Sequence, residues 1–405
     1  MSAHGETIYL DYAATAGKRP PQVADAVAHY LREIGATPGR GGHRLAVEAG
    51  RTALRCRLAL RNLLRIPGDP GRIAFMLNAT HALNTALSGV LRSGDVVVRT
   101  VFDHNAVRRP LNRLARERGV TVRIVPGDAS GAVDLAAAER LLADARLLVI
   151  NAASNVLGTP LPVRELGILA KRAGALVLVD AAQAAGHLPF DVGSMPIDLL
   201  AFTGHKGLLG PQGTGGLWVR DGVELEPLLL GGSGGDSLTP EMPEAYPDHL
   251  EAGTQNAPGI AGLLAGIEWL AVRDVAQLHE HTSALKLRLR EGLAALEGVR
   301  VLGPPAPDGP AVVTIVDRRL DAAALATRLD REHGVLARAG LHCAPDTHKL
   351  LGTDRSGALR LSLGWATTAE EVEHAVRAVA VCTGPQPRTV APSARRRHAL
   401  RKHAS

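Results

Sequence analysis

The sequence predicts an α/β protein whose larger part contains a mostly parallel sheet with helices on both faces. Two continuous apolar runs, 176–179 and 199–202, lack the alternation of a half-solvated strand, so we expect strands covered on both faces. Strand-like and helix-like stretches alternate along the first half of the chain, as crossover connections between parallel strands require. The 44 glycines and 25 prolines fit a loop-rich α/β protein better than a coiled coil.

The expected elements follow from the apolar pattern and from the glycine- and proline-containing breaks between apolar runs. In the first part we expect a short strand running into a loop at 8–15, helices at 22–34 and 45–64, a strand at 73–77, a helix opening at 78, strands at 95–98, 121–125 and 147–150, a helix at 164–173, and the two apolar strands. A loop at 231–247 and an apolar helix at 259–272 follow. The smaller part has expected helices at 282–296, 322–333 and 369–381 and strands at 299–302, 311–316, 335–338 and 358–363.

The length and the charge distribution predict two domains and a basic tail. A chain of 405 residues suffices for two domains that share an interface. We expect a large domain at 15–260, a small domain formed by 1–14 and 280–382, and a disordered tail at 383–405. The tail carries six basic residues and no acid, which equals the net charge of +6 of the whole chain. The folded part is therefore formally neutral, and binding of nucleic acid is not expected except through the tail.

The composition also indicates where in the cell the protein is located. No apolar stretch approaches the roughly 20 residues of a membrane span, and the N-terminus lacks the regions of a signal peptide. The three widely spaced cysteines, Cys56, Cys343 and Cys382, argue against a disulfide framework. We therefore expect a cytoplasmic protein without a membrane partner.

Polar residues follow the two apolar strands, at the edge where an open α/β sheet binds its ligand. Asp180 ends the first run, and Lys206 follows the second. A lysine amine there can form a Schiff base with an aldehyde cofactor, and an aspartate can keep the pyridine nitrogen of pyridoxal phosphate protonated. A capping aspartate and a solvated lysine are the simpler alternatives. Neither a Walker phosphate loop nor a dinucleotide fingerprint is present, because the lysine precedes the glycines at 210–216 and no Gly-x-Gly-x-x-Gly joins a strand to a helix.

Several motifs occur together in one order. They are Val179-Asp180-Ala-Ala-Gln183, Thr203-Gly-His205-Lys206 and Gly210-Pro-x-Gly-x-Gly. This pattern resembles the class V aminotransferase family, and within it the cysteine desulfurase and selenocysteine lyase group, from about Tyr9 to about Thr368. The resemblance implies the fold type I of pyridoxal-phosphate-dependent transferases.

The resemblance also implies a set of cofactor-binding residues. Lys206 would carry the cofactor, Asp180 would face its ring nitrogen, and His104 would cover the ring. Asn155 and Gln183 would lie on the side of its phenolic oxygen. Thr80 in Asn78-Ala-Thr80 would bind phosphate at a helix start, although capping of that helix is the simpler alternative. Thr203 and His205 would bind the same phosphate, together with Thr254 of a neighbouring subunit, so a homodimer is implied.

The second reactive centre is Cys343 in the segment Arg338-x-Gly340-x-His342-Cys343-Ala. Simple burial of the thiol, or metal binding with His342 and His348, are the alternatives; three ligands without a cysteine pair make a weak zinc pattern, and we expect no metal. The segment resembles the one that carries the persulfide-forming cysteine of group II cysteine desulfurases.

The resemblance implies that Asn155 also lies near the substrate carboxylate, and two further residues are implied to contact substrate. Arg360 matches the family arginine that pairs with the substrate carboxylate, a task that suits a guanidinium. Ala14 belongs to a segment that lines the substrate pocket in the family, although Tyr12 replaces the usual asparagine there. Trp365-Ala366-Thr367 likewise stands where Tyr-Asn-Thr is usual.

The sequence therefore predicts a pyridoxal-phosphate-dependent cysteine desulfurase, which converts L-cysteine to L-alanine and leaves a persulfide on Cys343, or the related selenocysteine lyase. Lys206, His104 and Cys343 are the expected catalytic residues, and a sulfur-acceptor protein is a possible partner class. Another class V reaction, such as transamination or an elimination in biosynthesis, is the enzymatic alternative. A non-catalytic binding protein that works through its basic tail is the alternative of a different class.

Overall fold

The computed structural model describes residues 7–39, 41–235 and 238–384. Its larger sheet has seven strands in the order β2-β8-β7-β6-β5-β3-β4. The five strands from β7 to β4 run parallel, and β8 is antiparallel to both of its neighbours, β2 and β7. The strands are β2 (Ile73–Met76), β3 (Val96–Thr100), β4 (Thr121–Val125), β5 (Leu147–Asn151), β6 (Leu176–Asp180), β7 (Leu199–Thr203) and β8 (Gly215–Val219). The predicted α/β fold with a mostly parallel sheet is confirmed.

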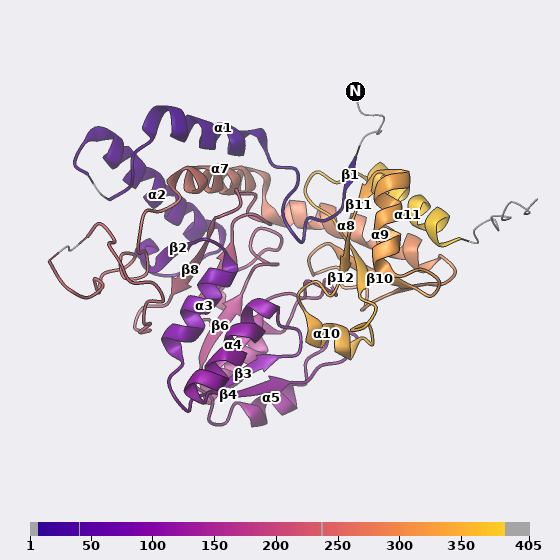
Figure 1. Ribbon diagram of the computed structural model, residues 1–405, viewed down its shortest axis with the longest axis horizontal. Helices are drawn as coiled ribbons and strands as arrows, with labels where there is room; N and C mark the ends of the chain where they lie inside the picture. Colours follow the sequence, from indigo (N-terminus) through magenta and orange to yellow (C-terminus); the bar gives the residue numbers. More distant parts are fainter. Residues whose placement is uncertain (1–6, 40, 236–237, 385–405) are drawn as a thin grey trace, which may run out of the picture.

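Helices cover both faces of this sheet (Figure 1). Val177 and Val179 of β6 point into one apolar core, and Leu178 points into the core on the opposite face. Because successive residues of a strand face opposite sides, a strand buried on both faces reads as an uninterrupted apolar run. The helices are α1 (Pro21–His29), α2 (Arg44–Leu63), α3 (Ala79–Val90), α4 (Asn105–Arg118), α5 (Leu135–Leu141), α6 (Val163–Arg172) and α7 (Ala257–Arg273).

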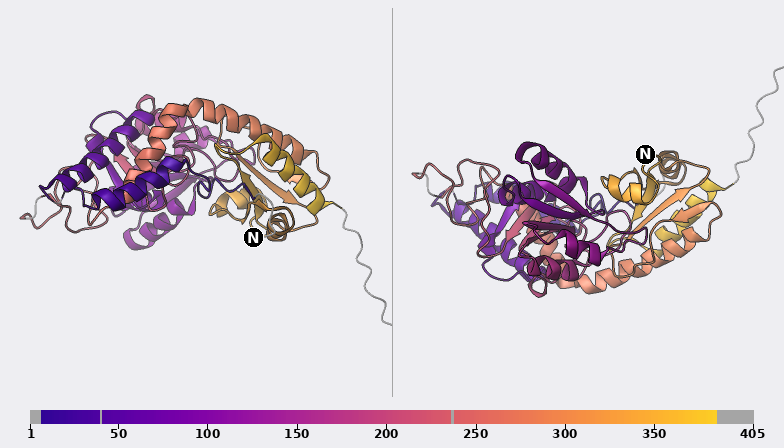
Figure 2. Two further views of the ribbon diagram at one scale, coloured as in Figure 1. Left: turned by 90° about the horizontal axis from the view of Figure 1, so that it is seen from above. Right: turned by 90° about the horizontal axis from the view of Figure 1, so that it is seen from below.

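A smaller antiparallel sheet, in the order β12-β13-β10-β9, lies beside the large one and has its own apolar core. Helices α7 and α8 run one after the other from the large sheet to the small one (Figure 2). The N-terminal β1 (Ile8–Tyr9) pairs in parallel with β11 (Val335–Leu336). The other elements here are α8 (Val275–Ala294), β9 (Val299–Val301), β10 (Val312–Asp317), α9 (Ala322–His333), β12 (Arg338–Gly340), α10 (Pro345–Leu350), β13 (Ala358–Ser362) and α11 (Ala369–Thr383).

Most expected elements occur within a few residues of their predicted places, but two differ, and four observed elements were not predicted. The helix expected at 22–34 ends as α1 at His29 and continues as a π-helical turn, Tyr30–Ile34. The strand expected at 335–338 is divided into β11 and β12, which pair with different strands. The unpredicted elements are helices α4, α5 and α10 and strand β8. Pro110 lies inside α4, and two glycines begin β8.

The division into a large domain at 15–260 and a small domain at 1–14 and 280–382 remains a prediction. Ile8 and Leu10 pack in the core of the small sheet, whereas Ala16 packs in a core of the large one. Residues 385–405 of the predicted tail lie outside the described residues. Within the described ranges, no helix is long and apolar enough to cross a membrane.

Candidate active site

A cavity of about 260 Å³ opens at the carboxyl ends of β5, β6 and β7, between the two sheets. An open parallel sheet binds ligands at this edge, because its loops and helix N-termini converge there. Nine of the predicted site residues line the cavity together with Ala14: they are Thr80, His104, Asn155, Asp180, Gln183, Thr203, His205, Lys206 and Arg360.

Lys206 and Asp180 supply the two charges at the base of the cavity. Asp180 is the last residue of β6, and Lys206 follows the end of β7, the strand that pairs with β6. Burial lowers the pKa of Lys206 to about 8, although the Asp180 carboxyl opposes that shift. Burial raises the pKa of Asp180, whereas a hydrogen bond from the Ala182 amide and the charge of Lys206 lower it. A lysine whose pKa is lowered in this way is a competent nucleophile near neutral pH.

The start of α3 provides an anion-binding end of the cavity. Asn78 is the N-cap residue of this helix, and its side chain accepts a hydrogen bond of 3.0 Å from the His81 amide. Thr80 is therefore not the cap, and its side chain faces the cavity. Unpaired amides of a helix start, with a hydroxyl beside them, bind phosphate groups.

His205 and Thr203 stand beside this anion-binding end. Nδ1 of His205 lies 3.1 Å from Oγ1 of Thr15, and the Thr15 hydroxyl donates to the His205 carbonyl. Burial, and secondarily Lys206, lower the pKa of His205 to about 4. Among the described residues, the buried Oγ1 of Thr203 has no hydrogen-bond partner.

His104 lies at the start of α4 as its N-cap residue. Its Nδ1 accepts a hydrogen bond of 3.0 Å from the Ala106 amide, so the proton of the neutral ring is on Nε2. Burial, followed by the charge of Lys206, lowers the pKa of His104 to about 4. The ring is therefore neutral at physiological pH and presents a flat apolar surface to the cavity.

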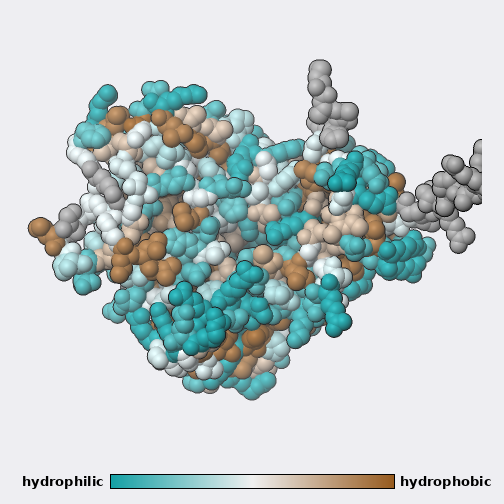
Figure 3. All heavy atoms as spheres, viewed as in Figure 1, coloured by the Kyte–Doolittle hydropathy of each residue, from teal (hydrophilic) through white to brown (hydrophobic). Residues whose placement is uncertain are grey.

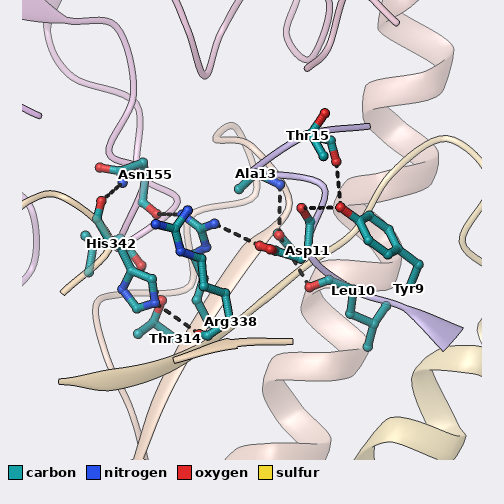
Figure 4. Close-up of polar contacts among 12 residues, drawn as sticks. Tyr9, Leu10, Asp11, Ala13, Thr15, Asn155, Thr314, Arg338 and His342 are labelled. Atoms are coloured by element: carbon teal, nitrogen blue, oxygen red, sulfur yellow. Dashed lines mark hydrogen bonds and ion pairs between the residues drawn. The ribbon is translucent and has the colours of Figure 1, made fainter. Parts of the chain in front are cut away.

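Asn155 and Gln183 lie on a third side of the cavity. Nε2 of Gln183 donates to the Ala13 carbonyl at 3.0 Å, while its buried Oε1 has no partner within the described part of the chain. Nδ2 of Asn155 donates to the carbonyl of His342 at 2.7 Å. Asn155 therefore joins a loop of the large sheet to the segment that carries Cys343 (Figure 4).

Two arginines enter from the small sheet. Arg338 of β12 and Arg360 of β13 are register partners, so their side chains leave the same face. Arg360 is 1% exposed and donates to Oδ1 of Asp11 at 2.9 Å and to the Asn155 carbonyl at 3.1 Å. Its Nε has no partner in the described ranges. The guanidinium is thus fixed in direction and retains a free N–H, as binding of a carboxylate requires.

Cys343 lies in a tight turn directly beyond the cavity wall. The Ala344 amide donates to the Leu341 carbonyl at 2.8 Å, and the two residues between them, His342 and Cys343, have φ of 48° and 58°. Positive φ at both central positions is the pattern of a type I′ turn, which normally takes asparagine and glycine. A non-glycine residue there costs about 1–2 kcal/mol. The carbonyl of Cys343 accepts a hydrogen bond of 2.7 Å from the Asn105 amide of α4.

The residues around the cavity fit pyridoxal phosphate. Thr203 Oγ1, Gln183 Oε1 and Arg360 Nε are buried and lack partners among the described residues, which native proteins avoid unless a ligand or water completes them. All three residues line the cavity. A ligand with anionic oxygens could accept hydrogen bonds from Thr203 and Arg360, and a ligand hydroxyl could donate to Oε1 of Gln183.

The structure leaves two predicted residues outside the cavity lining and adds four others. Thr254 is exposed, and Cys343 is half-buried beside His342. The unpredicted lining residues of polar type are Asn78, Asn151, Arg338 and His342. The position of Asn78 directly before an apolar helix could have indicated that it lines the cavity. The short distance in sequence from Arg338 and His342 to Cys343 could have indicated the same for them. Asn151 gives no such signal, because it simply ends a buried strand.

Comparison with known proteins agrees with this geometry. The sequence pattern of the family described as "Aminotransferase class-V" matches residues 8–375. A probable cysteine desulfurase of Methanothermobacter thermautotrophicus is 35% identical over 373 residues, covering 90% of this chain and 92% of that one. Another from Pseudomonas aeruginosa is 37% identical over 382 residues, covering 92% of each.

Solved structures show the same similarity. The apo structure of a cysteine desulfurase from Thermococcus onnurineus superposes with a TM-score of 0.87 at 33% identity, covering 93% of this chain and 94% of that one. The cysteine desulfurase CsdA from Escherichia coli, in an S-sulfonic acid form, gives 0.83 at 29% identity, covering 92% and 94%.

The fold and the cavity define an α/β enzyme with a buried lysine–aspartate pair. The chain belongs to the class V aminotransferase family, whose pattern covers nearly all of its described residues.

Proposed function

We propose that this protein is a pyridoxal-phosphate-dependent cysteine desulfurase. The observation that carries the proposal is the position of Cys343: a half-buried thiol in a strained turn lies beside a cavity that contains Lys206 and Arg360. Relatives and structural neighbours that are named cysteine desulfurases support it. Neither a transaminase nor an eliminase needs a thiol at this place, whereas sulfur transfer does.

Different residues bind different parts of the cofactor and the substrate. The α3 start, Thr80, Thr203 and His205 hold the cofactor phosphate, and Asp180 faces the ring nitrogen. His104 covers the ring and Gln183 contacts its oxygen side. Arg360 binds the substrate carboxylate by donating hydrogen bonds to it. The ion pair with Asp11 already holds the guanidinium in position. Bound pyridoxal phosphate supplies an electron sink for the negative charge that develops at the substrate Cα.

The chemical steps use Lys206 and Cys343. The neutral amine of Lys206 removes the Cα proton, as its lowered pKa allows near neutral pH. The Cys343 sulfur attacks the substrate sulfur, so that an S–S bond forms and the substrate Cβ–S bond breaks. The carbon product takes up protons and leaves as L-alanine, and Cys343 keeps the sulfur as a persulfide. Atoms balance because one sulfur moves from L-cysteine to the Cys343 thiol.

A single experiment tests the function. Purified protein loaded with pyridoxal phosphate is incubated with L-cysteine; alanine is quantified, and the peptide that contains Cys343 is analysed by mass spectrometry for one added sulfur. We expect alanine and the added sulfur together. Formation of a keto acid without alanine would point instead to transamination.

The other properties are proposed with this function. Selenocysteine is a second candidate substrate, because the same cavity would accept it and selenium leaves carbon more easily than sulfur does. A sulfur-acceptor protein is expected to take the persulfide sulfur, and the cytoplasm stays the predicted location. The reaction requires no metal ion.

A homodimer is also proposed, because Thr254 is exposed in the single chain instead of facing its own cavity. Exposed leucines lie nearby, at Leu77 beside α3 and at Leu228, Leu229 and Leu230 in the loop after β8. Figure 3 shows apolar side chains gathered on this side of the molecule. A second copy that covers them could bring its Thr254 to the phosphate end of the cavity.

A further inference from the structure

The turn that carries Cys343 contains two left-handed residues, neither of them glycine. Such a turn opens readily unless the surrounding structure holds it. Two of its carbonyls are held by the large sheet, since Asn155 binds that of His342 and the Asn105 amide binds that of Cys343. The side of the turn that faces the small sheet is held differently, through the ring of His342.

The ring of His342 takes part in a chain of side-chain hydrogen bonds that runs away from the cavity. Its Nε2 lies 3.1 Å from the carbonyl oxygen of Arg338, and its Nδ1 lies 3.1 Å from Nε2 of His348. Nδ1 of His348 in turn lies 2.7 Å from Oγ1 of Thr353. His342, His348 and Thr353 are all at most 3% exposed, so water does not compete for these bonds.

Only one arrangement of protons satisfies the chain while both rings are neutral. The Arg338 carbonyl can only accept, so Nε2 of His342 carries the proton and Nδ1 is bare. His348 must then donate from Nε2. Its bare Nδ1, at 2.7 Å, accepts the hydroxyl proton of Thr353 in preference to the His348 carbonyl, which lies 3.3 Å from the same hydroxyl. Burial lowers the pKa of His342 to about 3 and that of His348 to about 4, so both rings are neutral at physiological pH.

This arrangement excludes two other roles for the histidine pair. Both nitrogens of His342 are occupied, so the ring has no free site with which to take a proton from the substrate. A metal site formed by His342, Cys343 and His348 is also not supported: in the described part of the chain, the residues whose side chains meet metal-ligand spacing are Glu332, His333 and Cys382. A role in holding the backbone remains.

We propose that His348 and Thr353 are positioning residues, which fix His342 in one tautomer and so keep the 341–344 turn closed with Cys343 against the cavity. They touch neither substrate nor cofactor and act through His342. The kinetic part of this proposal rests on the proposed function, whereas the structural part concerns the turn alone.

The experiment separates these two parts. Hydrogen exchange of the Ala344 amide reports closure of the turn, because this amide donates to the Leu341 carbonyl, and it needs neither cofactor nor substrate. In His348→Leu we expect exchange to accelerate about tenfold, the effect of one lost buried hydrogen bond. Alanine formation should slow to a similar degree, with the KM for L-cysteine and the cofactor absorbance unchanged, because Arg360 and Lys206 are untouched.

Matched variants decide between hydrogen bonding and packing. His348→Gln keeps an N–H near the Nε2 position and should restore most of the slow exchange and most of the rate. Thr353→Val removes only the hydroxyl, leaves the fold intact, and should show a smaller acceleration in the same direction. His374→Leu is the control, because it removes a side-chain hydrogen bond of a histidine of α11, to the His333 carbonyl, that takes no part in the chain from His342 to Thr353.

Two outcomes overturn the proposal. Unchanged exchange at Ala344 in both Thr353→Val and a folded His348→Leu would show that the histidine pair only fills space. Equal defects in His348→Gln and His348→Leu would show that ring volume, not the hydrogen bond, is what matters. If exchange accelerates but no variant, nor the parent protein, forms alanine, the positioning role stands and the desulfurase function fails.

Discussion

The thiol of Cys343 and the amine of Lys206 have separate tasks, and single substitutions can separate them. In the proposed function, the cofactor is held by Lys206, Asp180 and the cavity end at the start of α3, none of which contacts the thiol in the polar network described above. Sulfur transfer needs a nucleophile aligned with the substrate sulfur, and water is a poor replacement.

Cys343→Ala should therefore bind pyridoxal phosphate normally and still show a spectral change with L-cysteine. Alanine formation should fall by orders of magnitude, because the attacking sulfur is gone. The measurement is alanine released per cofactor site. Cys56→Ala and Cys382→Ala are the controls, since both thiols are buried and should leave turnover unchanged. Full activity of Cys343→Ala would make this thiol structural and favour a biosynthetic class V reaction.

The lowered pKa of Lys206 predicts a pH dependence in the cofactor-free protein. The neutral amine is the reactive form, and a lowered pKa means that it predominates above about pH 8. The rate of reductive methylation of Lys206, followed by mass spectrometry, should rise through pH 8 and level off near pH 9. In the denatured chain the same residue should titrate near its ordinary value of 10.5. A folded-state midpoint near 10.5 would contradict the buried environment.

At the residue scale, sequence motifs correctly predicted those cavity-lining residues whose side chains carry a charged or reactive group. Lys206, Asp180 and Arg360 are examples. Sequence reasoning did not find that His104 caps α4, or that His342 is tied to His348, because those roles depend on backbone groups placed by distant parts of the fold. Thr80 had two interpretations, and only the position of Asn78 at the helix start excludes the capping one.

At the scale of elements, a buried ion pair fixes the segment that carries Thr254. Oε1 of Glu251 accepts hydrogen bonds from Nη2 of Arg57 at 2.5 Å and from the Phe75 amide at 2.6 Å. Arg57 also donates to the Ile73 carbonyl and lies over the ring of Phe75. Helix α2, strand β2 and the segment after 250 are thereby joined at one carboxylate.

Glu251→Ala should destabilise the protein by about 3–5 kcal/mol, because it leaves the buried Arg57 without its charge partner. Glu251→Gln should cost less, since the amide oxygen can still accept from Phe75. Urea unfolding measures both. The matched control is Glu268→Ala, which breaks the exposed ion pair between Arg55 of α2 and Glu268 of α7 and should cost under about 1 kcal/mol. Equal losses for Glu251 and Glu268 would contradict the assigned burial.

Two of the unpredicted elements, β8 and α4, show where local patterns mislead. Strand β8 begins with Gly215 and Gly216, which resemble a loop, but a Cβ at Gly215 would lie 2.7 Å from backbone atoms of Asn78 and Phe202. These glycines are required by close packing between strands and not by a turn. Helix α4 tolerates Pro110 in its interior because its apolar face is buried against the sheet, and tertiary contacts outweigh the lost hydrogen bond.

At the scale of the whole molecule, the proposed dimer predicts a shared cofactor site. Thr254→Ala should weaken retention of pyridoxal phosphate, measured as cofactor lost on dialysis, more than Ser233→Ala does. Both residues lie after β8, but only Thr254 has the proposed phosphate contact across the interface. Sedimentation should give a dimer at micromolar concentration. A fully active monomer would exclude the shared site.

The N-terminal segment that follows β1 has a consequence for how the protein is made. Ala13 donates its amide to Ser362, and Asp11 pairs with Arg360; each pair is separated by 349 positions in the sequence. During synthesis, Asp11 and Ala13 remain without these partners until β13 has left the ribosome, because contacts between such distant segments form late. The cavity wall that contains Arg360 is therefore among the last parts to be completed, and a nascent chain would place Arg360 there only after the large sheet has formed.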